Sequence, residues 1–270
     1  MKNIRDIEKY CDDEVCATRN AETVDDYEKN RSFEYRVTNS LVNYDDWKEK
    51  KIIDIGVGGG TEFLKFLNAG AYSYGIDLTQ SAISYTYERA KDYKNLRDLQ
   101  KANCENLEIF HESNFDLAFS YGVVHHSANP DKCVDEINKI LKKNGTFIGM
   151  VYSDFSLTGI YLWLLHGLFK LNPFQTQKNI ISKHLESPNT NCYSNKEWTA
   201  LLESKGFEVI TMYKMLSIGD ALKMDLNLNK FPKWMNPVYN FIRFIMPTRF
   251  LMFFENFWGL NLCFIAKKIN

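Results

Sequence analysis

The sequence has 270 residues, of which 45% are hydrophobic and 14% aromatic, enough for a large core and too many for a disordered chain. Its formal net charge of −1 provides no whole-chain positive field, so we expect no nucleic-acid partner. The six cysteines include no C-x-x-C pair, which predicts reduced thiols, no disulfide framework and no metal site. No apolar run reaches about 18 residues and the N-terminus is polar and acidic, so we expect no transmembrane helix, no signal peptide and a cytoplasmic location.

Residues 1–44 are expected to form an N-terminal segment of their own. Residues 1–23 are polar and acidic and should be partly loose. Residues 24–44 carry apolar side chains near helical spacing. These side chains are Tyr27, Phe33, Val37 and Leu41. They predict a helix that either packs on the edge of the core or covers a ligand as a lid.

A glycine-rich turn follows the first predicted strand, residues 51–55, whose isoleucines are typical of a buried parallel strand. Glycines here allow a tight turn and the close approach of a ligand. They are Gly56, Gly58 and Gly60. Thr61 then begins a helix to about residue 68, and its first N–H groups suit an anionic group. Thr61 occupies the place where a dinucleotide fingerprint requires Gly or Ala, so D-x-G-x-G-x-G starting at Asp54 fits better.

The second predicted strand, residues 72–76, runs directly into an acidic residue. Asp77 follows Gly60 by 17 residues, close to the ~20 expected of an acid that binds a ribose. Its two carboxylate oxygens can accept both ribose hydroxyls. The alternative is that Asp77 is the N-cap of the next predicted helix, residues 79–94.

Two further segments follow the third and fourth predicted strands, residues 97–102 and 115–120. The first reads Asn103-Cys104-Glu105-Asn106-Leu107. The second reads Ser120-Tyr121-Gly122-Val123-Val124-His125-His126-Ser127. Ligands bind at the carboxyl ends of the strands in an open parallel sheet, so both segments should border a ligand, although the first could also be an ordinary polar turn.

Taken together, these motifs resemble those of the class I S-adenosylmethionine-dependent methyltransferases, in particular the methyltransferase type 11 or ubiquinone–menaquinone-biosynthesis-like group. The two post-strand segments are similar to the family's D-A-E-N-L-P and V-L-H-H. Residues 142–146 match its L-K-P-G-G turn into strand five, and residues 201–207 match its L-L-x-x-x-G-F step into strand six. Asn103 replaces the family's Asp, but its carbonyl oxygen can still accept from an adenine amino group.

The resemblance implies S-adenosylmethionine as cofactor and methyl donor. It places Asp54 and the glycine turn at the methionine end, Asp77 at the ribose, and Asn103 with Cys104 at the adenine. Leu78 and Tyr121 are further implied cofactor contacts. From the N-terminal helix, Tyr27 or Arg31 could face the same ligand.

It also implies an α/β fold, with a Rossmann-like, mostly parallel sheet of seven strands, helices on both faces and an antiparallel last strand at about 260–267. The core would comprise residues 45–152, 194–213 and 259–270. Two insertions should form helical caps on the substrate side of one structural domain. They are residues 153–193, after strand five, and residues 214–258, between strands six and seven.

Catalysis by direct displacement mainly requires alignment of nucleophile, methyl carbon and sulfur. A base can assist, and His126 or His125 is best placed for that role; the alternative is that one histidine packs the loop and the other binds. Tyr152, at the end of strand five, could contact the acceptor. In the first insertion, His184 and Glu186 form a second candidate pair.

The second insertion contains nine Phe and Trp residues interleaved with Lys and Arg. Residues 238–258 could be cap core, a dimer interface or a peripheral membrane-surface helix, and we favour cap core. Pro247 should divide them into two short helices.

The sequence therefore predicts transfer of a methyl group from S-adenosylmethionine to a small molecule or biosynthetic intermediate. Whether oxygen, nitrogen or carbon is methylated stays open. One alternative is a non-catalytic cofactor-binding or scaffold protein on the same fold. An NAD-dependent oxidoreductase is another, and Thr61 argues against it.

Overall fold

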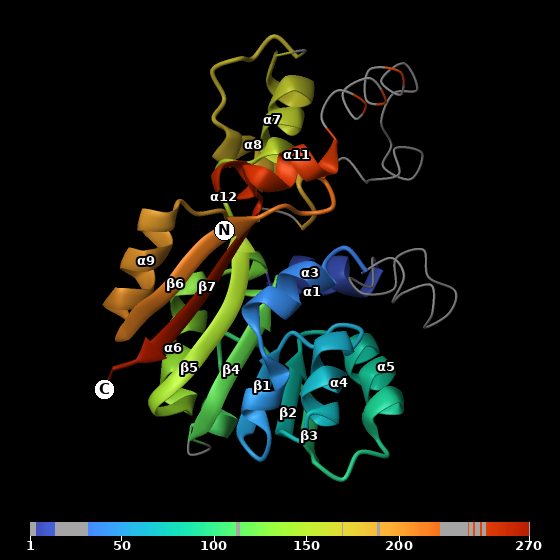
Figure 1. Ribbon diagram of the computed structural model, residues 1–270, viewed down its shortest axis with the longest axis vertical. Helices are drawn as coiled ribbons and strands as arrows, with labels where there is room; N and C mark the ends of the chain where they lie inside the picture. The colour runs from blue at the N-terminus through green and yellow to red at the C-terminus, as the bar shows by residue number, and fades with distance from the viewer. Residues whose placement is uncertain are drawn as a thin grey trace.

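The computed structural model describes residues 4–13, 32–111, 114–168, 170–187, 190–221 and 247–269, together with 237, 240 and 244. Seven strands form one sheet in the order β3-β2-β1-β4-β5-β7-β6 (Figure 1). The strands are β1 (Lys51–Ile55), β2 (Tyr72–Asp77), β3 (Leu96–Lys101), β4 (Phe115–Tyr121), β5 (Leu141–Tyr152), β6 (Phe207–Met215) and β7 (Asn261–Lys268). The first five pair in parallel, and β7 runs antiparallel to both β5 and β6. The expected fold class is confirmed.

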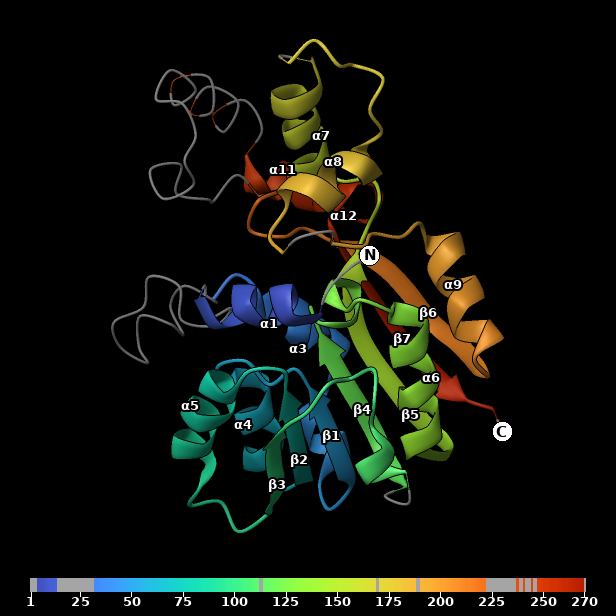
Figure 2. The same cartoon turned by 180° about the vertical axis from the view of Figure 1, so that it is seen from behind.

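Helices flank the sheet and gather beyond one end of it. The α-helices are α1 (Ile4–Asp13), α3 (Tyr35–Leu41), α4 (Thr61–Asn68), α5 (Gln80–Ala90), α6 (Pro130–Ile140), α7 (Leu157–Trp163), α8 (Gln177–His184), α9 (Asn195–Ser204), α11 (Thr248–Phe253) and α12 (Glu255–Trp258). Shorter pieces are η1 (Tyr44–Trp47), η2 (Glu108–Phe110), η3 (Val124–His126) and the π-helix η4 (Leu164–Leu168). Figure 2 shows α6 and α9 on one side of the sheet.

Alternation along β1 explains why both faces are covered. Successive side chains of a strand point to opposite faces. Ile53 and Ile55 join the cluster that includes Ile137 of α6 and Trp198 of α9. Ile52 joins the opposite cluster, with side chains of α3 and α4. A strand buried on both faces in this way explains the continuous isoleucine run in the sequence.

The helix starts follow the sequence signals closely. Asn129 caps α6, with Pro130 in its first turn. Ser194 and Glu197 form the predicted capping box at α9: the Ser194 side chain accepts from the Glu197 N–H at 3.2 Å, and Glu197 Oε2 accepts from the Ser194 N–H at 2.9 Å. Gly70, at φ +87, ends α4 as expected.

Several helix predictions need correction. Residues 4–13, within a segment expected to be partly loose, form the helix α1, which is held by a hydrogen bond from Ser81 to Asp12 and by the pair Glu8–Lys101. The helix α5 ends at Ala90 rather than 94, since the chain turns there into β3. Helix α8 was not predicted. The described part of the predicted 24–44 helix is α3, and Tyr27 and Arg31 lie outside the described residues.

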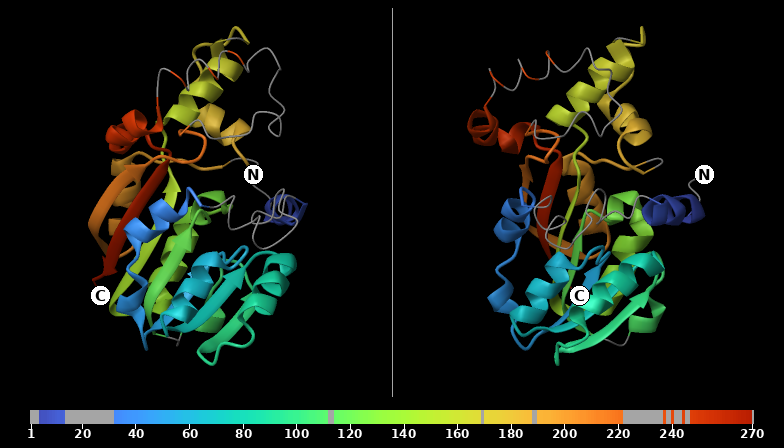
Figure 3. Two further views of the ribbon diagram at one scale, coloured as in Figure 1. Left: turned by 45° about the vertical axis from the view of Figure 1, so that its right-hand side comes forward. Right: turned by 90° about the vertical axis from the view of Figure 1, so that its right-hand side faces the viewer.

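The helices of both insertions lie beyond the carboxyl end of β5. Figures 1 and 3 show α7, α8, α11 and α12 grouped there, away from α4 and α5. Leu157, Leu216 and Leu251 form the buried contact that joins them. Segments from two distant parts of the chain are therefore packed into one cap-like group.

Glu136 ties α6 to the segment after β3 and should make stability depend on pH. Although burial raises its pKa, hydrogen bonds from Lys139, the Leu107 N–H and His111 hold the pKa of Glu136 at about 2. Because this lies below the ordinary value of 4.5, the carboxylate contributes stability above pH ~4.5 and loses it as pH falls towards 2. We expect Glu136→Gln to lower the free energy of unfolding by about 2 kcal/mol at pH 7 and by much less near pH 3.

Urea unfolding at the two pH values measures this difference. Asp135→Asn is the matched control, because it removes the exposed partner of the same Lys139 and should have less than about 1 kcal/mol of effect. Equal losses for Glu136→Gln at both pH values would contradict the assignment.

Candidate active site

The glycine turn is held against the segment that follows β4. Gly56, Gly58 and Gly60 have φ of +87, +51 and +81. A Cβ at Gly56 would lie 2.1 Å from Val123 Cγ2, and one at Gly60 would lie 2.7 Å from Thr86 Cγ2. Glycine is therefore required for protein packing as well as for the approach of a ligand.

Asp77 joins this turn to the start of α5. Its Oδ2 accepts from the Gly58 N–H at 3.0 Å, and its Oδ1 accepts from the N–H and the hydroxyl of Thr79, both at 2.9 Å. Burial raises the pKa of Asp77, and the Thr79 and Gly58 hydrogen bonds oppose the rise. The N-cap of α5 is Thr79, whose Oγ1 accepts from Ala82, so the alternative of Asp77 as N-cap is wrong. Leu78 follows at the same edge, and Asp54 is buried within β1.

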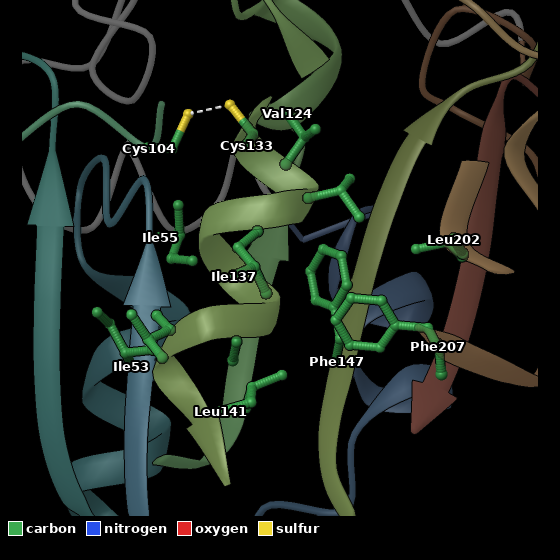
Figure 4. Close-up of a cluster of buried hydrophobic side chains, with 14 of the residues drawn as sticks. Ile53, Ile55, Cys104, Val124, Cys133, Ile137, Leu141, Phe147, Leu202 and Phe207 are labelled. Carbon is green, nitrogen blue, oxygen red and sulfur yellow. Dashed lines mark hydrogen bonds between the residues drawn. The ribbon is translucent and has the colours of Figure 1, made fainter. Parts of the chain in front are cut away.

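The segment after β3 packs more tightly than the sequence indicates. Asn103 Oδ1 accepts from the Glu105 N–H at 2.9 Å, so an adenine amino group would share that oxygen, which has two lone pairs. Cys104 Sγ lies 2.9 Å from Cys133 Sγ, and Figure 4 shows the two sulfurs facing each other. Glu105, which the sequence reasoning missed, accepts from the backbone N–H groups of Ala128 and Asn129 at 2.8 and 3.0 Å.

Tyr121, at the end of β4, meets the N-terminal segment. Its hydroxyl donates to Glu34 Oε2 at 2.6 Å, and the Asn261 side chain donates to the same oxygen at 3.4 Å. Glu34 precedes α3, so this part of the N-terminal segment reaches the carboxyl end of the sheet. No sequence signal marked Glu34.

The two adjacent histidines have different surroundings. His125 is fully buried, and its ring centroid lies 4.0 Å from that of Tyr152 and 4.1 Å from that of His126. The His126 side chain is 17% exposed, with Nδ1 2.6 Å from Ser187 Oγ and Nε2 3.2 Å from Glu186 Oε2. His125 is therefore buried against Tyr152, whereas part of the His126 side chain remains exposed.

Three predicted site residues from separate elements come together at one carboxylate. Tyr152, the last residue of β5, donates its hydroxyl to Glu186 Oε2 at 2.8 Å, and this is the oxygen that faces His126. Two side chains that the sequence reasoning missed, Ser187 and Thr190, surround His126 Nδ1. Ser187 and Thr190 belong to the stretch after α8. No sequence pattern linked that stretch to His126.

The predicted pair of His184 and Glu186 is not formed. His184 stacks on His166 instead, with ring centroids 3.8 Å apart and planes 6° apart. Both histidines have lowered pKa values, caused first by burial. His184 ends α8, and the chain then turns so that Glu186 points towards His126.

In the described part of residues 238–258, some side chains are buried and others are exposed. Pro247 is the N-cap of α11, and both α11 and α12 follow it. Most of the predicted helix before Pro247 lies outside the described residues, so the division at Pro247 stays a prediction. Leu251 is fully buried, whereas Phe253 is 81% and Phe257 65% exposed. One side of these helices packs against Leu157 and Leu216, and the other presents aromatic rings.

Among the residues that the structure describes, no group of three or more His, Cys, Asp and Glu side chains is placed to hold a metal ion. Within the same part of the chain, no helix has both the length and the apolar character needed to cross a membrane.

The strand order and the antiparallel β7 are those of the Rossmann-like fold of the class I S-adenosylmethionine-dependent methyltransferases. The glycine turn is tied to Asp77, the last residue of β2. Residues 53–149 match the family described as "Methyltransferase domain". Residues 53–149 therefore carry a methyltransferase domain within a fold of the class I S-adenosylmethionine-dependent type, and S-adenosylmethionine is the cofactor of that class.

The chain is similar in sequence to curated relatives and in fold to solved structures. An uncharacterized protein of Methanocaldococcus jannaschii is 33% identical over 168 residues, 59% of this chain and 62% of that protein. A ubiquinone biosynthesis O-methyltransferase of Pelagibacter ubique is 34% identical over 98 residues, 36% of this chain and 40% of that protein. The magnesium protoporphyrin IX methyltransferase of Synechocystis PCC 6803 with bound SAH has the same fold, with a TM-score of 0.62 at 12% identity over 98% of this chain and 100% of that chain. The matches span less than two thirds of either curated relative.

Proposed function

We propose that this protein transfers the methyl group of S-adenosylmethionine to a small-molecule acceptor by direct displacement. The observation that carries the proposal is that the glycine turn and the His126 cluster contact the same short segment after β4. Val123 lies against Gly56 of the glycine turn, and its carbonyl accepts from the His126 N–H at 2.9 Å. The proposed cofactor site and the His126–Glu186–Tyr152 cluster therefore meet on one short segment.

The residues at the sheet edge fit a nucleoside ligand. Asp77 is partly buried and already fixed by three hydrogen bonds, so it would offer its oxygens to a ribose without further ordering. Asn103 and Cys104 would border the adenine, with Leu78 beside the ribose. Asp54, the glycine turn and Tyr121 would border the methionine end, as would Tyr27 or Arg31 outside the described residues. When bound, S-adenosylmethionine supplies a methyl group activated by its sulfonium.

On the acceptor side, the proposal gives His126 the role of base and gives Tyr152 and Glu186 contacts with the acceptor. Residues 153–193 and 214–258 would form the cap of a single structural domain whose core is 45–152, 194–213 and 259–270. The exposed rings of α11 and α12 leave both a dimer contact and a membrane-surface contact as proposals for residues 238–258. The Pelagibacter ubique relative is named as an O-methyltransferase, which supports an oxygen acceptor without fixing it.

Cofactor binding tests the proposal directly. Calorimetric titration should show that the protein binds S-adenosylhomocysteine and does not bind NAD. We expect Asp77→Ala to weaken that binding by about 1–3 kcal/mol, because a charged hydrogen-bond acceptor for the ribose is lost and the glycine turn is loosened. Asp92→Ala, an exposed change in the turn before β3, is the control and should bind as the wild type does.

Unchanged affinity in a folded Asp77→Ala variant would refute the ribose role. Binding of NAD alone would favour the oxidoreductase alternative. Binding of S-adenosylhomocysteine without methylation of any acceptor would favour the scaffold alternative.

A further inference from the structure

Two cysteine thiols meet where the segment after β3 packs against α6. Cys104 Sγ lies 2.9 Å from Cys133 Sγ, although the two residues are 29 positions apart in the chain. Figure 4 shows the sulfurs pointing towards each other from these separate elements. Both are free thiols. The S–S bond of a disulfide is about 2.05 Å long, so the two sulfurs need to approach each other by less than about 1 Å to form one.

Hydrogen bonds on both sides of the thiol pair hold the two segments together. On one side, Glu105 accepts from the Ala128 and Asn129 N–H groups, just before α6, at 2.8 and 3.0 Å. On the other side, the Leu107 N–H donates to Glu136 Oε2 of α6 at 2.8 Å. The surrounding backbone therefore fixes the position of both thiols, and a bond between them requires movement of side chains only.

Two other buried cysteines have different neighbours. Cys192 Sγ lies 3.9 Å from the Lys178 carbonyl oxygen, and Cys263 Sγ lies 3.7 Å from the Asn261 carbonyl oxygen. Burial raises the pKa of Cys192 to about 12 and raises the pKa of Cys263 well above its usual value. A carbonyl group cannot replace a second thiol in a disulfide, so these two cysteines serve as internal references.

The two thiols of the pair differ in their access to an oxidant. Cys104 is 9% exposed, whereas Cys133 is 0% exposed. Burial raises the pKa of the Cys133 thiol well above its usual value, and the neighbouring Cys104 raises it further. The thiolate is the form that attacks an oxidant. Cys104 should therefore react first, and Cys133 should then react with the oxidised Cys104.

We propose that Cys104 and Cys133 form a dithiol–disulfide modification site for hydrogen peroxide or a similar small two-electron oxidant, and that a bound cofactor shields this site. The disulfide itself is independent of the proposed function. The shielding rests on it, because the proposed function places Asn103 and Cys104 beside the adenine. An adenine at that edge of the sheet would cover the thiol through which the oxidant reaches the pair.

The reaction balances in atoms and electrons. Cys104 Sγ attacks one oxygen of hydrogen peroxide, the O–O bond breaks, and one water leaves as Cys104 becomes a sulfenic acid. Cys133 Sγ then attacks that sulfur, the S–O bond breaks, and the departing hydroxyl takes the Cys133 proton to form a second water. The two thiols lose two electrons, and one peroxide is reduced to two water molecules. Because Cys133 Sγ is only 2.9 Å away, it can trap the sulfenic acid before further oxidation.

The first test looks for the disulfide in the full-length protein without a ligand. The protein is treated with a small excess of hydrogen peroxide and unfolded in N-ethylmaleimide, and its peptides are examined by mass spectrometry. We expect the Cys104 and Cys133 peptides to be linked and to separate with dithiothreitol, and Cys192 and Cys263 to carry N-ethylmaleimide. Recovery of Cys104 and Cys133 as blocked thiols, under conditions that oxidise added glutathione, would overturn the proposal.

Single substitutions test the order of reaction. Cys133→Ser removes the second thiol, so a sulfenic acid should accumulate at Cys104, where dimedone captures it. Cys104→Ser should leave Cys133 as a thiol, because Cys133 is buried. Cys11→Ser, on α1, is the matched control and should still form the linked pair. Thermal midpoints show that each variant is folded, and dimedone on Cys133 instead of Cys104 would overturn the assigned order.

The second test asks whether the cofactor shields the thiols. If only the unliganded protein reacts, S-adenosylhomocysteine at about ten times its Kd should slow disulfide formation about tenfold. The concentration dependence should give the same Kd as calorimetry, and NAD should have no effect. Asp77→Ala should lose most of this protection and still form the disulfide, whereas the exposed control Asp92→Ala should keep both.

The outcomes separate the shielding from the proposed function. Disulfide formation at an undiminished rate, with S-adenosylhomocysteine bound, would overturn the shielding alone. A protein that does not bind S-adenosylhomocysteine would overturn the proposed function and the shielding with it. In both cases the result of the first test would stand by itself, because it uses no ligand.

Discussion

His126→Gln should lower kcat for methyl transfer by about 10²–10⁴-fold and leave the affinity for S-adenosylhomocysteine unchanged. Glutamine preserves much of the size and polarity of His126 but cannot take up a proton near neutral pH. The cofactor motifs lie at or just after the ends of β1, β2 and β3, so they do not depend on the imidazole. Because His126 also packs against His125, the thermal midpoint of the variant must be measured beside its kinetics.

His184→Gln is the matched control for this substitution. His184 is exposed and stacks on His166 rather than on any member of the His126 cluster, so its loss should change kcat less than threefold, the effect of roughly 0.6 kcal/mol. If His126→Gln retained wild-type turnover and its pH profile, the base role would have to be abandoned. A large loss in His184→Gln would instead mean that the second histidine pair takes part.

Gly56→Ala should remove measurable cofactor binding and lower the free energy of unfolding by about 3 kcal/mol. Positive φ at a residue with a side chain costs roughly 1–2 kcal/mol. The new Cβ would also lie 2.1 Å from Val123 Cγ2, and relief of such overpacking costs typically 1–3 kcal/mol more. Any movement of Val123 displaces the backbone that carries His126, so the damage should extend from the glycine turn to the proposed catalytic cluster.

Gly122→Ala separates these two effects. Gly122 has a similar φ of +78, but its added Cβ would meet only Met150 Cε at 3.6 Å, an ordinary contact. Urea unfolding should therefore give a smaller loss for Gly122→Ala, due to backbone strain alone. Adding Val123→Ala to Gly56→Ala should recover part of the stability. Equal losses at Gly56 and Gly122, with no recovery in the double variant, would show that the Val123 contact is unimportant.

Most of the fold could be predicted because its signals are local. Each of these signals comes from residues that are a few positions apart in the chain. They are the isoleucines of β1, the glycines after it, Asp77 at the end of β2 and the Ser194–Glu197 capping box. The order of these elements along the chain then permits few sheet topologies, because the helical crossover between two parallel strands is almost always right-handed. The errors fell where local pattern is weak, as in the polar α1, which is stabilised by Ser81 and Lys101 from other elements.

Only part of the proposed catalytic cluster could be predicted, because its members come from segments that are far apart in the chain. Position after a strand was enough to mark His126 and Tyr152 as candidates, and Glu186 was marked beside the wrong histidine. Ser187 and Thr190 were not marked at all, since they lie 61 and 64 residues from His126 along the chain. The spacing of Ser187 and Thr190 in the sequence does not indicate whether the insertion that contains them folds back on the sheet.

The sequence by itself thus determined the sheet, the glycine turn and the candidate ribose-binding acid, because hydrogen-bonding and hydrophobic periods are properties of neighbouring residues. Only the tertiary structure decided that Glu186 faces His126 while His184 stacks on His166. It also decided that Glu34 meets Tyr121, across 87 residues. Such contacts depend on the path of whole segments through space, and the physical cause is packing among elements that are remote in the chain.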